Sequence, residues 1–281
     1  MIHIVQDGFD GFGHQLYGLF SCMILHNING YYFDGIYFKN KHFKFDHINM
    51  EITQKTKEYL IAISNEFINY YKLTEKKYEN IIYSHEIYHI PTNYDFNTLY
   101  RLDNAYYFEK IPNYNQIKLE HKNNISIIKK LFINDKLPEN KLKKNNIVIH
   151  IRGGDAFTNG RDTVINKYNK QILKLLPILF EKYKNYTYYI HSDDNVDFLI
   201  DLIKKNNNIE YFHFAKSTNI MEVISDFIYS DIFIMGISAL SYICSFLGEH
   251  KLIICNDDCK HSINNQVVKI SDFIKNKNTF R

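Results

Sequence analysis

The segment IVIHIRGGD, which ends at Asp155, brings a cation, two glycines and a carboxylate together behind an apolar run. Arg152 offers a planar guanidinium whose paired N–H groups match the oxygens of a phosphate. Gly153 and Gly154 let the backbone approach such a ligand closely, because glycine has no side chain. The alternative is a structural ion pair between Arg152 and Asp155 that only holds the loop. We predict that Arg152 binds a phosphate within a loop that includes Gly154 and Asp155.

Two further segments place small polar groups at the ends of apolar runs. In YYIHSDD these residues are Ser192, Asp193 and Asp194. In FIMGISALSYIC the residues at the expected start of a helix are Ser238, Ala239, Leu240 and Ser241. Free N–H groups at a helix N-terminus attract anions, although Ser192 and Ser238 are also suited to cap the helices that follow them. Ligands of open α/β sheets bind at the carboxyl ends of the strands, so we expect the three segments to meet at one phosphate-bearing ligand.

The elements that must position these segments alternate between strands and helices. Apolar runs of strand length lie at Ile147–Ile151, Tyr186–Ile190, Ile209–Phe214, Ile232–Met235 and Leu252–Cys255. Segments with helical spacing of apolar residues lie at Lys167–Tyr183, Val196–Lys205, Ile220–Tyr229 and Ala239–Gly248. This alternation is typical of a parallel sheet built from βαβ units.

The N-terminal part opens in a similar way. A strand at Ile2–Val5 is followed by a loop with Gly8, Gly11 and Gly13, and then by a helix whose apolar stripe runs from Leu16 to Ile24. A second strand is expected near Gly30–Phe38, and the region from there to about Asn140 is expected to be mostly helical. The segment KLPENKLKKNN, Lys136–Asn146, combines a proline with a charge run and no apolar period, which is typical of a linker. We predict an α/β protein with two Rossmann-like domains, residues 1–140 and 141–281, that face each other across a cleft.

The composition excludes several classes of protein. A formal charge of +3, from 34 Lys and Arg against 31 Asp and Glu, is too small for binding that depends on neutralising a phosphate backbone, so no nucleic acid partner is expected. The four cysteines are too few and too scattered for a disulfide framework, and we expect reduced thiols. Because no apolar run approaches about 18 residues and no signal sequence is recognisable, we expect a cytoplasmic protein without integral membrane association.

Four motifs resemble those of the fucosyltransferase superfamily, which includes the α-1,2-fucosyltransferases of glycosyltransferase family 11 and the protein O-fucosyltransferases. HIRGGD resembles their His-x-Arg-x-Gly-Asp motif, and YIHSDDN resembles a strand that ends in Ser/Thr-Asp-Asp. DIFIMGISALSYICSFLG is similar to the third motif, an apolar strand followed by Ser-Ser-Phe-Ser, and GFGHQLYGLF resembles the N-terminal Gly-x-Gly-Asn-Gln. The resemblance covers residues 1–27 and 146–248.

This resemblance implies a GT-B fold and the inverting, metal-independent transfer of fucose from GDP-fucose to a glycan hydroxyl. No cofactor and no metal ligands are implied. Arg152 would hold the donor pyrophosphate, while His150 and Asp155 would shape its strand and loop. The remaining donor-side residues would be Gly154, Ser192, Asp193, Asp194 and Ser238 to Ser241. Near the reacting sugar the resemblance places Gly11, Gly13 and His14.

The chain departs from the family pattern at three places. His14 stands where the family has Asn, Gly153 where many members have a second Arg, and Leu240-Ser241-Tyr242 at the Ser-Phe-Ser position. A different nucleotide-sugar donor and a protein Ser or Thr acceptor therefore stay open. The base for the acceptor hydroxyl is also open, with His14, Asp10 and Asp7 as candidates.

Three other functions compete with the transferase. HEIYH, with His85, Glu86 and His89, matches the motif of zinc peptidases, but Pro91 follows at once and the segment alternates like a strand. A nicotinamide enzyme would use Asp34 as the ribose-binding acid, although the glycine spacing is not the dinucleotide fingerprint. A non-catalytic sugar-binding module is the third alternative, since the missing second Arg is compatible with lost catalysis.

Overall fold

The chain forms two compact units, Met1–Lys136 and Leu137–Arg281, in a computed structural model of all 281 residues. The residues that the structure describes are 3–7, 12–29, 32–37, 50–74, 77–83, 97–102, 122–133, 137–152, 162–192, 212–216, 220–259 and 267–276. The division falls four residues before the predicted boundary at residue 140. Leu137 is already buried in the second unit, so its packing draws the start of the predicted linker into that unit.

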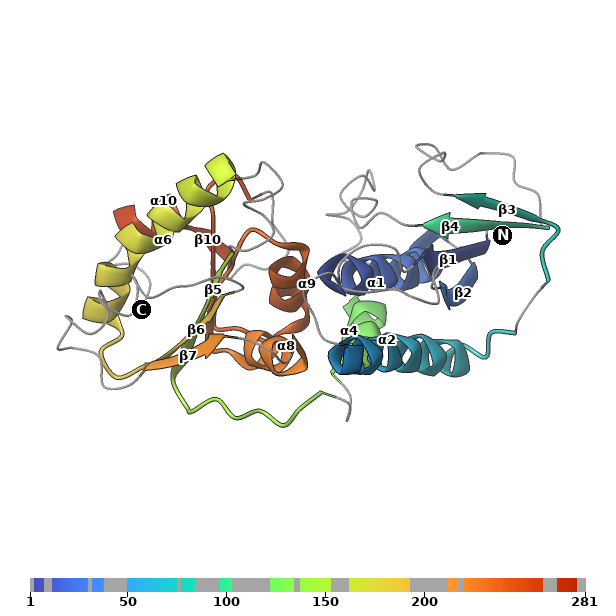
Figure 1. Ribbon diagram of the computed structural model, residues 1–281, viewed down its shortest axis with the longest axis horizontal. Coiled ribbons are helices and arrows are strands. Elements are labelled where there is room, and N and C mark those ends of the chain that lie inside the picture. The colour runs from blue at the N-terminus through green and yellow to red at the C-terminus, as the bar shows by residue number, and fades with distance from the viewer. Residues whose placement is uncertain are drawn as a thin grey trace. The chain divides into compact units, whose positions relative to one another are not determined.

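The first unit contains a four-stranded parallel sheet in the order β2-β1-β4-β3 (Figure 1). Its strands are β1 (His3–Asp7), β2 (Tyr32–Tyr37), β3 (Asn80–Tyr83) and β4 (Thr98–Leu102). Its helices are α1 (Phe12–Asn29), α2 (Met50–Tyr70) and α4 (Lys122–Phe132). The prediction of a mostly helical middle region was wrong for β3 and β4. Both strands pair within this sheet, and such long-range pairing leaves no strong local signal in short strands.

Aromatic side chains join the three helices of the first unit. Phe20 of α1 packs edge-on against Phe132 of α4, with the ring centroids 5.7 Å apart. The Tyr59 hydroxyl of α2 donates a hydrogen bond to the Phe132 carbonyl. Phe67 of α2 lies 5.3 Å from Phe33 of β2, which ties the helices to the sheet. These side chains are fully buried and hold α1, which carries two of the predicted site residues.

The second unit contains a six-stranded parallel sheet in the order β10-β9-β8-β5-β6-β7 (Figure 1). Its strands are β5 (Asn146–Ile151), β6 (Thr187–Ser192), β7 (Phe212–Lys216), β8 (Ile232–Ile234), β9 (Leu252–Cys255) and β10 (Val267–Lys269). Its helices are α6 (Asp162–Lys182), α8 (Ile220–Tyr229), α9 (Ala239–Leu247) and α10 (Ile270–Lys275). The predicted α/β class with parallel sheets is confirmed.

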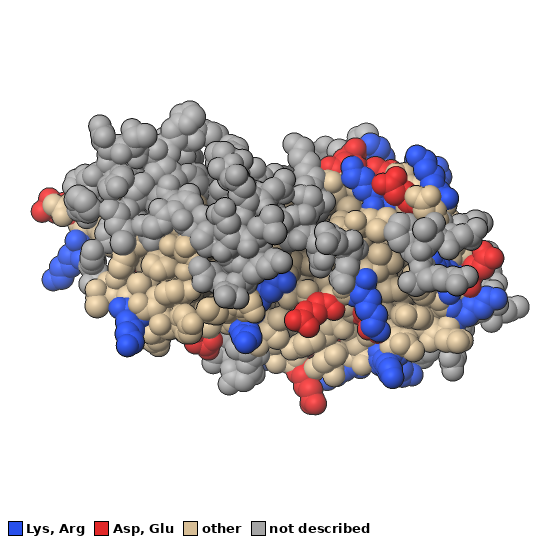
Figure 2. Space-filling model, turned by 180° about the vertical axis from the view of Figure 1, so that it is seen from behind, with Lys and Arg blue, Asp and Glu red and all other residues tan. Residues whose placement is uncertain are grey.

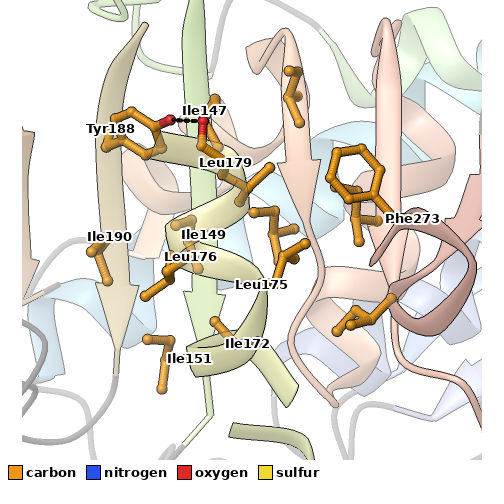
Figure 3. Close-up of a cluster of buried hydrophobic side chains, with 14 of the residues drawn as sticks. Ile147, Ile149, Ile151, Ile172, Leu175, Leu176, Leu179, Tyr188, Ile190 and Phe273 are labelled. Carbon is orange, nitrogen blue, oxygen red and sulfur yellow. Dashed lines mark hydrogen bonds between the residues drawn. The ribbon is translucent and has the colours of Figure 1, made fainter. Parts of the chain in front are cut away.

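Helices cover both faces of this sheet, which explains why its strands read as continuous apolar runs. Figure 3 shows Ile147, Ile149 and Ile151 of β5 directed toward α6, where they meet residues such as Leu175. The alternate residues of a strand point to the opposite face, so His150 is directed toward α8. There its ring lies against Phe227, with the ring centroids 5.1 Å apart. On the α6 side of the sheet, the Tyr188 hydroxyl donates a hydrogen bond to the Leu179 carbonyl at 3.0 Å.

Asp231 joins three elements at the amino ends of the strands. Its carboxylate accepts hydrogen bonds from the backbone N–H of Asn146 at 3.1 Å and from Lys251 Nζ at 2.7 Å. Burial alone would raise the pKa of Asp231, but the hydrogen bonds from Lys251 and Asn146 outweigh it and lower the pKa. Asp231 therefore ties these elements together at the end of the sheet that is opposite the carboxyl ends of its strands.

Several predicted element boundaries in the second unit shift in the structure. α6 begins five residues before the predicted Lys167, and β10 and α10 were not predicted at all. β6 extends two residues past the predicted end, because His191 and Ser192 pair with Ala215 and Lys216 of β7. The predicted helix Val196–Lys205 lies outside the described residues.

The surface and the helices bear on possible partners. Among the residues that the structure describes, no helix is long and apolar enough to cross a membrane. On the face seen in Figure 2, Lys and Arg side chains are interspersed with Asp and Glu. This mixed-charge surface fits the small formal charge of +3.

Candidate functional site

Two neighbouring strands bring the first and third predicted segments to one edge of the second unit's sheet. β5 and β8 are parallel partners, with Ile149 opposite Ile234. Both strands end just beyond this pair, β5 before Arg152 and β8 before Gly236. The carboxyl edge of the sheet thus holds the cation and the small-residue loop side by side.

A chain of hydrogen bonds links these two strand ends through buried groups. The N–H of Gly236 donates to Ser241 Oγ at 3.2 Å, and the Ser241 hydroxyl is hydrogen-bonded to Nδ1 of His150. Ser241 Oγ thus accepts from Gly236 and shares a second hydrogen bond with His150, in which either atom can be the donor, depending on the imidazole tautomer. Exposure is 6% for His150 and 0% for Ser241. These two side chains therefore bind each other, and they fix the loop between β8 and α9.

Gly236 is tightly confined by His150. A Cβ atom at this position would lie 2.5 Å from His150 Nδ1 and 3.0 Å from the His150 carbonyl oxygen. Real Cβ atoms do not approach backbone oxygens or buried rings this closely. The site therefore requires glycine at residue 236 for space, since no left-handed backbone angle is involved.

The N-terminus of α9 presents backbone N–H groups of the kind that bind anions. Ser238 is the N-cap, and its Oγ accepts a hydrogen bond from the N–H of Ser241 at 3.0 Å. The N–H groups of Ala239 and Leu240 begin the helix and have no acceptor within it. The first turn carries no acidic side chain. Ser238 thus acts as the capping residue that was the alternative for it, and Ala239 and Leu240 offer the N–H donors.

Arg152 follows directly after β5 and is half-buried. Its backbone carbonyl accepts a hydrogen bond from Asn169 Nδ2 of α6 at 3.2 Å. Its charge acts on the neighbouring His150. Burial is the main reason that the pKa of His150 is lowered to about 3, and the positive charge of Arg152 adds to that shift. A permanent cation, neutral His150 and helix N–H groups therefore lie along one sheet edge.

The second predicted segment is supported by residues of α8 that the sequence did not single out. Ser192 ends β6 beside Ile151 of β5 and is buried. Next to it, His191 Nε2 lies 3.0 Å from Asp226 Oδ2 of α8, an ion-pair distance without the geometry of a hydrogen bond. Phe227 packs against the rings of both His191 and His150. One helical turn of α8 thus supports two adjacent strand ends.

The sequence indicates only weakly that α8 and Asn169 contact these strand ends. α8 is an apolar helix in which Asp226 is one of few charged residues, and the segment ISDFIY does not reveal which strands it meets. Asn169 lies in a helix predicted from its apolar stripe, and its contact with the Arg152 carbonyl depends on the tertiary fold.

In the first unit, Gly13 and His14 belong to the first turn of α1. The helix begins at Phe12, earlier than the predicted stripe from Leu16, and Gly13 was expected in the loop. Phe12 is buried against Tyr59, with ring centroids 6.5 Å apart, and this packing holds the first turn despite the low helix propensity of glycine. Asp7 is the last residue of β1. These residues lie at the carboxyl end of that strand.

Several predicted site residues lie outside the described part of the chain. They are Gly11, Gly154, Asp155, Asp193 and Asp194, and the same holds for Asp10 and for the motif of His85, Glu86 and His89. Within the described residues, no group of three or more His, Cys, Asp or Glu is arranged to hold a metal ion. Asp34 lies inside β2 and shares a hydrogen bond with Tyr78, whereas a ribose-binding acid belongs at a strand end.

The buried His150 predicts a pH effect on stability. The folded protein keeps His150 neutral down to about pH 3, while the unfolded chain takes up a proton near pH 6.5. This contribution to stability is therefore complete above pH 6.5 and is lost as the pH falls toward 3. We expect His150→Gln to make the free energy of unfolding less dependent on pH between 6.5 and 4.5, by up to about 1.4 kcal/mol per pH unit. Urea unfolding of both proteins across this range measures the difference, and equal slopes would contradict a neutral His150.

Comparison with known proteins gives a structural answer. No protein-family model and no curated protein sequence matches the chain. The crystal structure of POFUT1 in complex with GDP superimposes with a TM-score of 0.51 at 12% identity, covering 96% of this chain and 98% of that one. POFUT1 in complex with GDP-fucose gives a TM-score of 0.50 at 11% identity, covering 95% and 97%. The fucosyltransferase NodZ from Bradyrhizobium gives 0.42 at 10% identity, covering 88% and 93%.

The likeness to POFUT1 covers nearly the whole chain and concerns the fold. It confirms the predicted GT-B class and, at the level of the fold, the predicted resemblance to fucosyltransferases. The roles of the individual site residues stay predictions.

Proposed function

We propose that the protein is a glycosyltransferase that moves fucose from GDP-fucose to a glycan hydroxyl, with inversion and without a metal ion. The observation that carries this proposal is the parallel pairing of β5 with β8, after which Arg152 and the loop that leads into α9 follow at the same carboxyl edge of the sheet. This edge is where α/β sheets bind their ligands. The fold shared with POFUT1, which binds GDP and GDP-fucose, supports the nucleotide.

The proposed chemistry follows from where charge develops. In the transfer, the bond between the sugar's anomeric carbon and the diphosphate oxygen breaks, and GDP leaves with the electron pair. Preorganised donors that face the growing negative charge lower the barrier. Arg152 supplies a permanent charge, and the N–H groups of Ala239 and Leu240 supply fixed dipoles that need no reorganisation. A cation and a helix N-terminus thereby take the role that a metal ion has in other enzymes.

The neutral His150 has a supporting role in this scheme. A protonated imidazole would place a second, buried positive charge beside Arg152, which is unfavourable. Burial prevents protonation, so Gly236, Ser241 and α9 stay in place over the physiological pH range. We assign His150 and Ser241 as positioning residues, whose influence on the donor passes through the loop from residues 236 to 240.

On the acceptor side we propose His14 as the residue near the reacting sugar. The acceptor oxygen forms the new bond to the anomeric carbon, and its proton must pass to a base. His14 is half-buried in the first turn of α1, so an imidazole is accessible there where the family has an amide. Asp7, at the end of β1, is the alternative base.

A thermal-shift comparison of GDP, UDP, CMP and NAD tests the nucleotide class directly. We expect GDP to raise the melting temperature more than the other three, and to do so equally in buffer with EDTA. A metal-free protein that responds only after a divalent cation is restored would contradict metal independence. Stabilisation by NAD alone, or by none of the four, would overturn the proposal.

GDP binding without transfer defines the competing sugar-binding module. Incubation of the purified protein with GDP-fucose and a panel of free glycans, followed by detection of released GDP and fucosylated product, separates the two. Product formation supports the transferase, while tight GDP-fucose binding without product on any acceptor favours the module.

A further inference from the structure

Two cysteines that the proposed transfer does not use lie together at the carboxyl end of β9. Cys255 is the last residue of the strand, and Cys259 follows a turn closed by a hydrogen bond from its N–H to the Asn256 carbonyl, at 3.1 Å. The turn folds the chain back so that the two thiol groups are hydrogen-bonded to each other. Neither cysteine is in a disulfide. A dithiol is therefore already assembled in the folded protein.

The two sulfur atoms differ in their access to solvent. Cys255 is 1% exposed, whereas Cys259 is only half-buried. The hydrogen bond with Cys259 and burial both raise the pKa of Cys255, so this thiol is protonated in the resting protein and gives up its proton only when its sulfur reacts. A reagent in solution consequently meets Cys259 first, and Cys255 is the group that stands behind it.

A buried polar group without a hydrogen-bond partner lies beside the dithiol. Tyr168 of α6 is 2% exposed, and its hydroxyl lies near both thiols and near Asp257. Within the described part of the chain this hydroxyl has no hydrogen-bond partner. A buried hydroxyl without a partner is costly in an ordinary core, and here it can donate to the thiolate that forms when a sulfur reacts.

We propose that Cys255 and Cys259 are a redox-active dithiol that is oxidised to an intrachain disulfide by a low-molecular-weight disulfide such as oxidised glutathione. The Cys259 thiolate attacks one sulfur of the reagent, which forms a mixed disulfide and releases one thiolate. The Cys255 thiolate then attacks Cys259 Sγ, which closes the intrachain disulfide and releases the second thiolate. Two thiol protons leave, the two cysteines are oxidised, and one reagent disulfide is reduced to two thiols.

The turn between the two cysteines is hydrogen-bonded to neighbouring elements, which a disulfide in the turn would constrain. The Asp257 carboxylate accepts hydrogen bonds from the N–H of Ser271 at 2.9 Å and from Gln171 Nε2 at 3.2 Å. Lys269 Nζ donates to the Asp257 carbonyl at 2.9 Å. The turn therefore joins β9 to α6 and α10, and a covalent closure from residue 255 to residue 259 fixes this joint. None of these hydrogen bonds involves Arg152 or the N-terminus of α9.

Peptide mapping of the native protein tests the proposal. The reduced protein is incubated with oxidised glutathione, remaining thiols are alkylated, and the peptides are examined by mass spectrometry. We expect the peptide with residues 255 and 259 to lose two hydrogens and to resist alkylation. The fully buried Cys22 and Cys244 serve as internal controls, and they should stay alkylation-resistant and unoxidised until the protein is denatured.

Two variants distinguish the roles of the two sulfurs. Cys255→Ser should stop at a stable mixed disulfide on Cys259, and Cys259→Ser should remain unmodified at Cys255. If the unaltered protein keeps both thiols reduced, or accumulates the mixed disulfide at Cys259, the proposal is wrong. Neither outcome depends on GDP binding, so this test stands apart from that of the transferase.

Discussion

Replacing Arg152 with lysine is expected to lower fucose transfer by a factor of roughly 100 or more while the protein stays folded. Lysine keeps the positive charge but offers a single point donor, which cannot reproduce two parallel hydrogen bonds to a diphosphate. The Arg backbone carbonyl is held by Asn169, so the backbone at residue 152 should stay in place in the variant. Some GDP affinity should remain, because the charge is retained. Turnover, GDP affinity and melting temperature are to be measured together on Arg152→Lys and on Arg152→Ala, for which we expect a larger loss.

The structural alternative for Arg152 makes the opposite prediction. An ion pair with Asp155 that only holds the loop would tolerate lysine and would make Arg152→Ala less stable. Near-normal turnover of Arg152→Lys would therefore refute the leaving-group role. Lys167→Ala is a suitable control, because it removes an exposed cation of α6 that pairs with Asp258 at 3.0 Å. We expect this variant to retain full turnover.

The second unit could be predicted from sequence because its strands are covered on both faces. Ile147, Ile149 and Ile151 face one layer of helices, and Val148 between them is buried on the other face. Strands of this kind read as uninterrupted apolar runs that differ clearly from the amphipathic helices between them. The strand β9 and the helix α8 were predicted with the observed limits.

The parts that escaped prediction depend on partners far along the chain. β3 is a four-residue strand whose hydrogen bonds go to β4, and Ile81 on it is exposed, so the strand-like alternation of the segment around HEIYH was not enough to predict it as part of a sheet. The position of Ser192 within β6 depends on pairing with Lys216 of β7. The resemblance implied that His150 shapes its strand and loop, but the sequence could not reveal that Ser241, 91 residues later, is hydrogen-bonded to its ring nitrogen.

Gly236→Ala is expected to be the most damaging small substitution at the site. Its Cβ would lie 2.5 Å from His150 Nδ1 and 3.0 Å from the His150 carbonyl oxygen. Neither atom can move freely, because the ring is buried against Phe227 and the carbonyl belongs to the central strand β5. We expect the free energy of unfolding to fall by about 1–3 kcal/mol, as for other overpacked cores. Chemical denaturation at neutral pH measures this loss.

The same substitution should also weaken donor binding. To relieve the contact, the chain must move away from His150, which separates the Gly236 N–H from Ser241 Oγ and shifts the start of α9. Loss of one well-placed hydrogen bond to a charged phosphate corresponds to roughly a tenfold or greater loss of GDP affinity. Isothermal titration with GDP at a temperature where the variant is folded gives this value.

Gly248→Ala provides the matched control for Gly236→Ala. Gly248 caps the other end of α9, and a Cβ there would lie 2.5 Å from the Ile228 carbonyl oxygen, so this variant should lose stability for the same steric reason. The anion-binding N–H groups of Ala239 and Leu240 are at the opposite end of the helix and should stay in place. We therefore expect Gly248→Ala to be less stable but to bind GDP normally. If both glycine variants lost the same amount of GDP affinity, the weakening would reflect general loosening of the unit, and the specific role of the loop between β8 and α9 would be refuted.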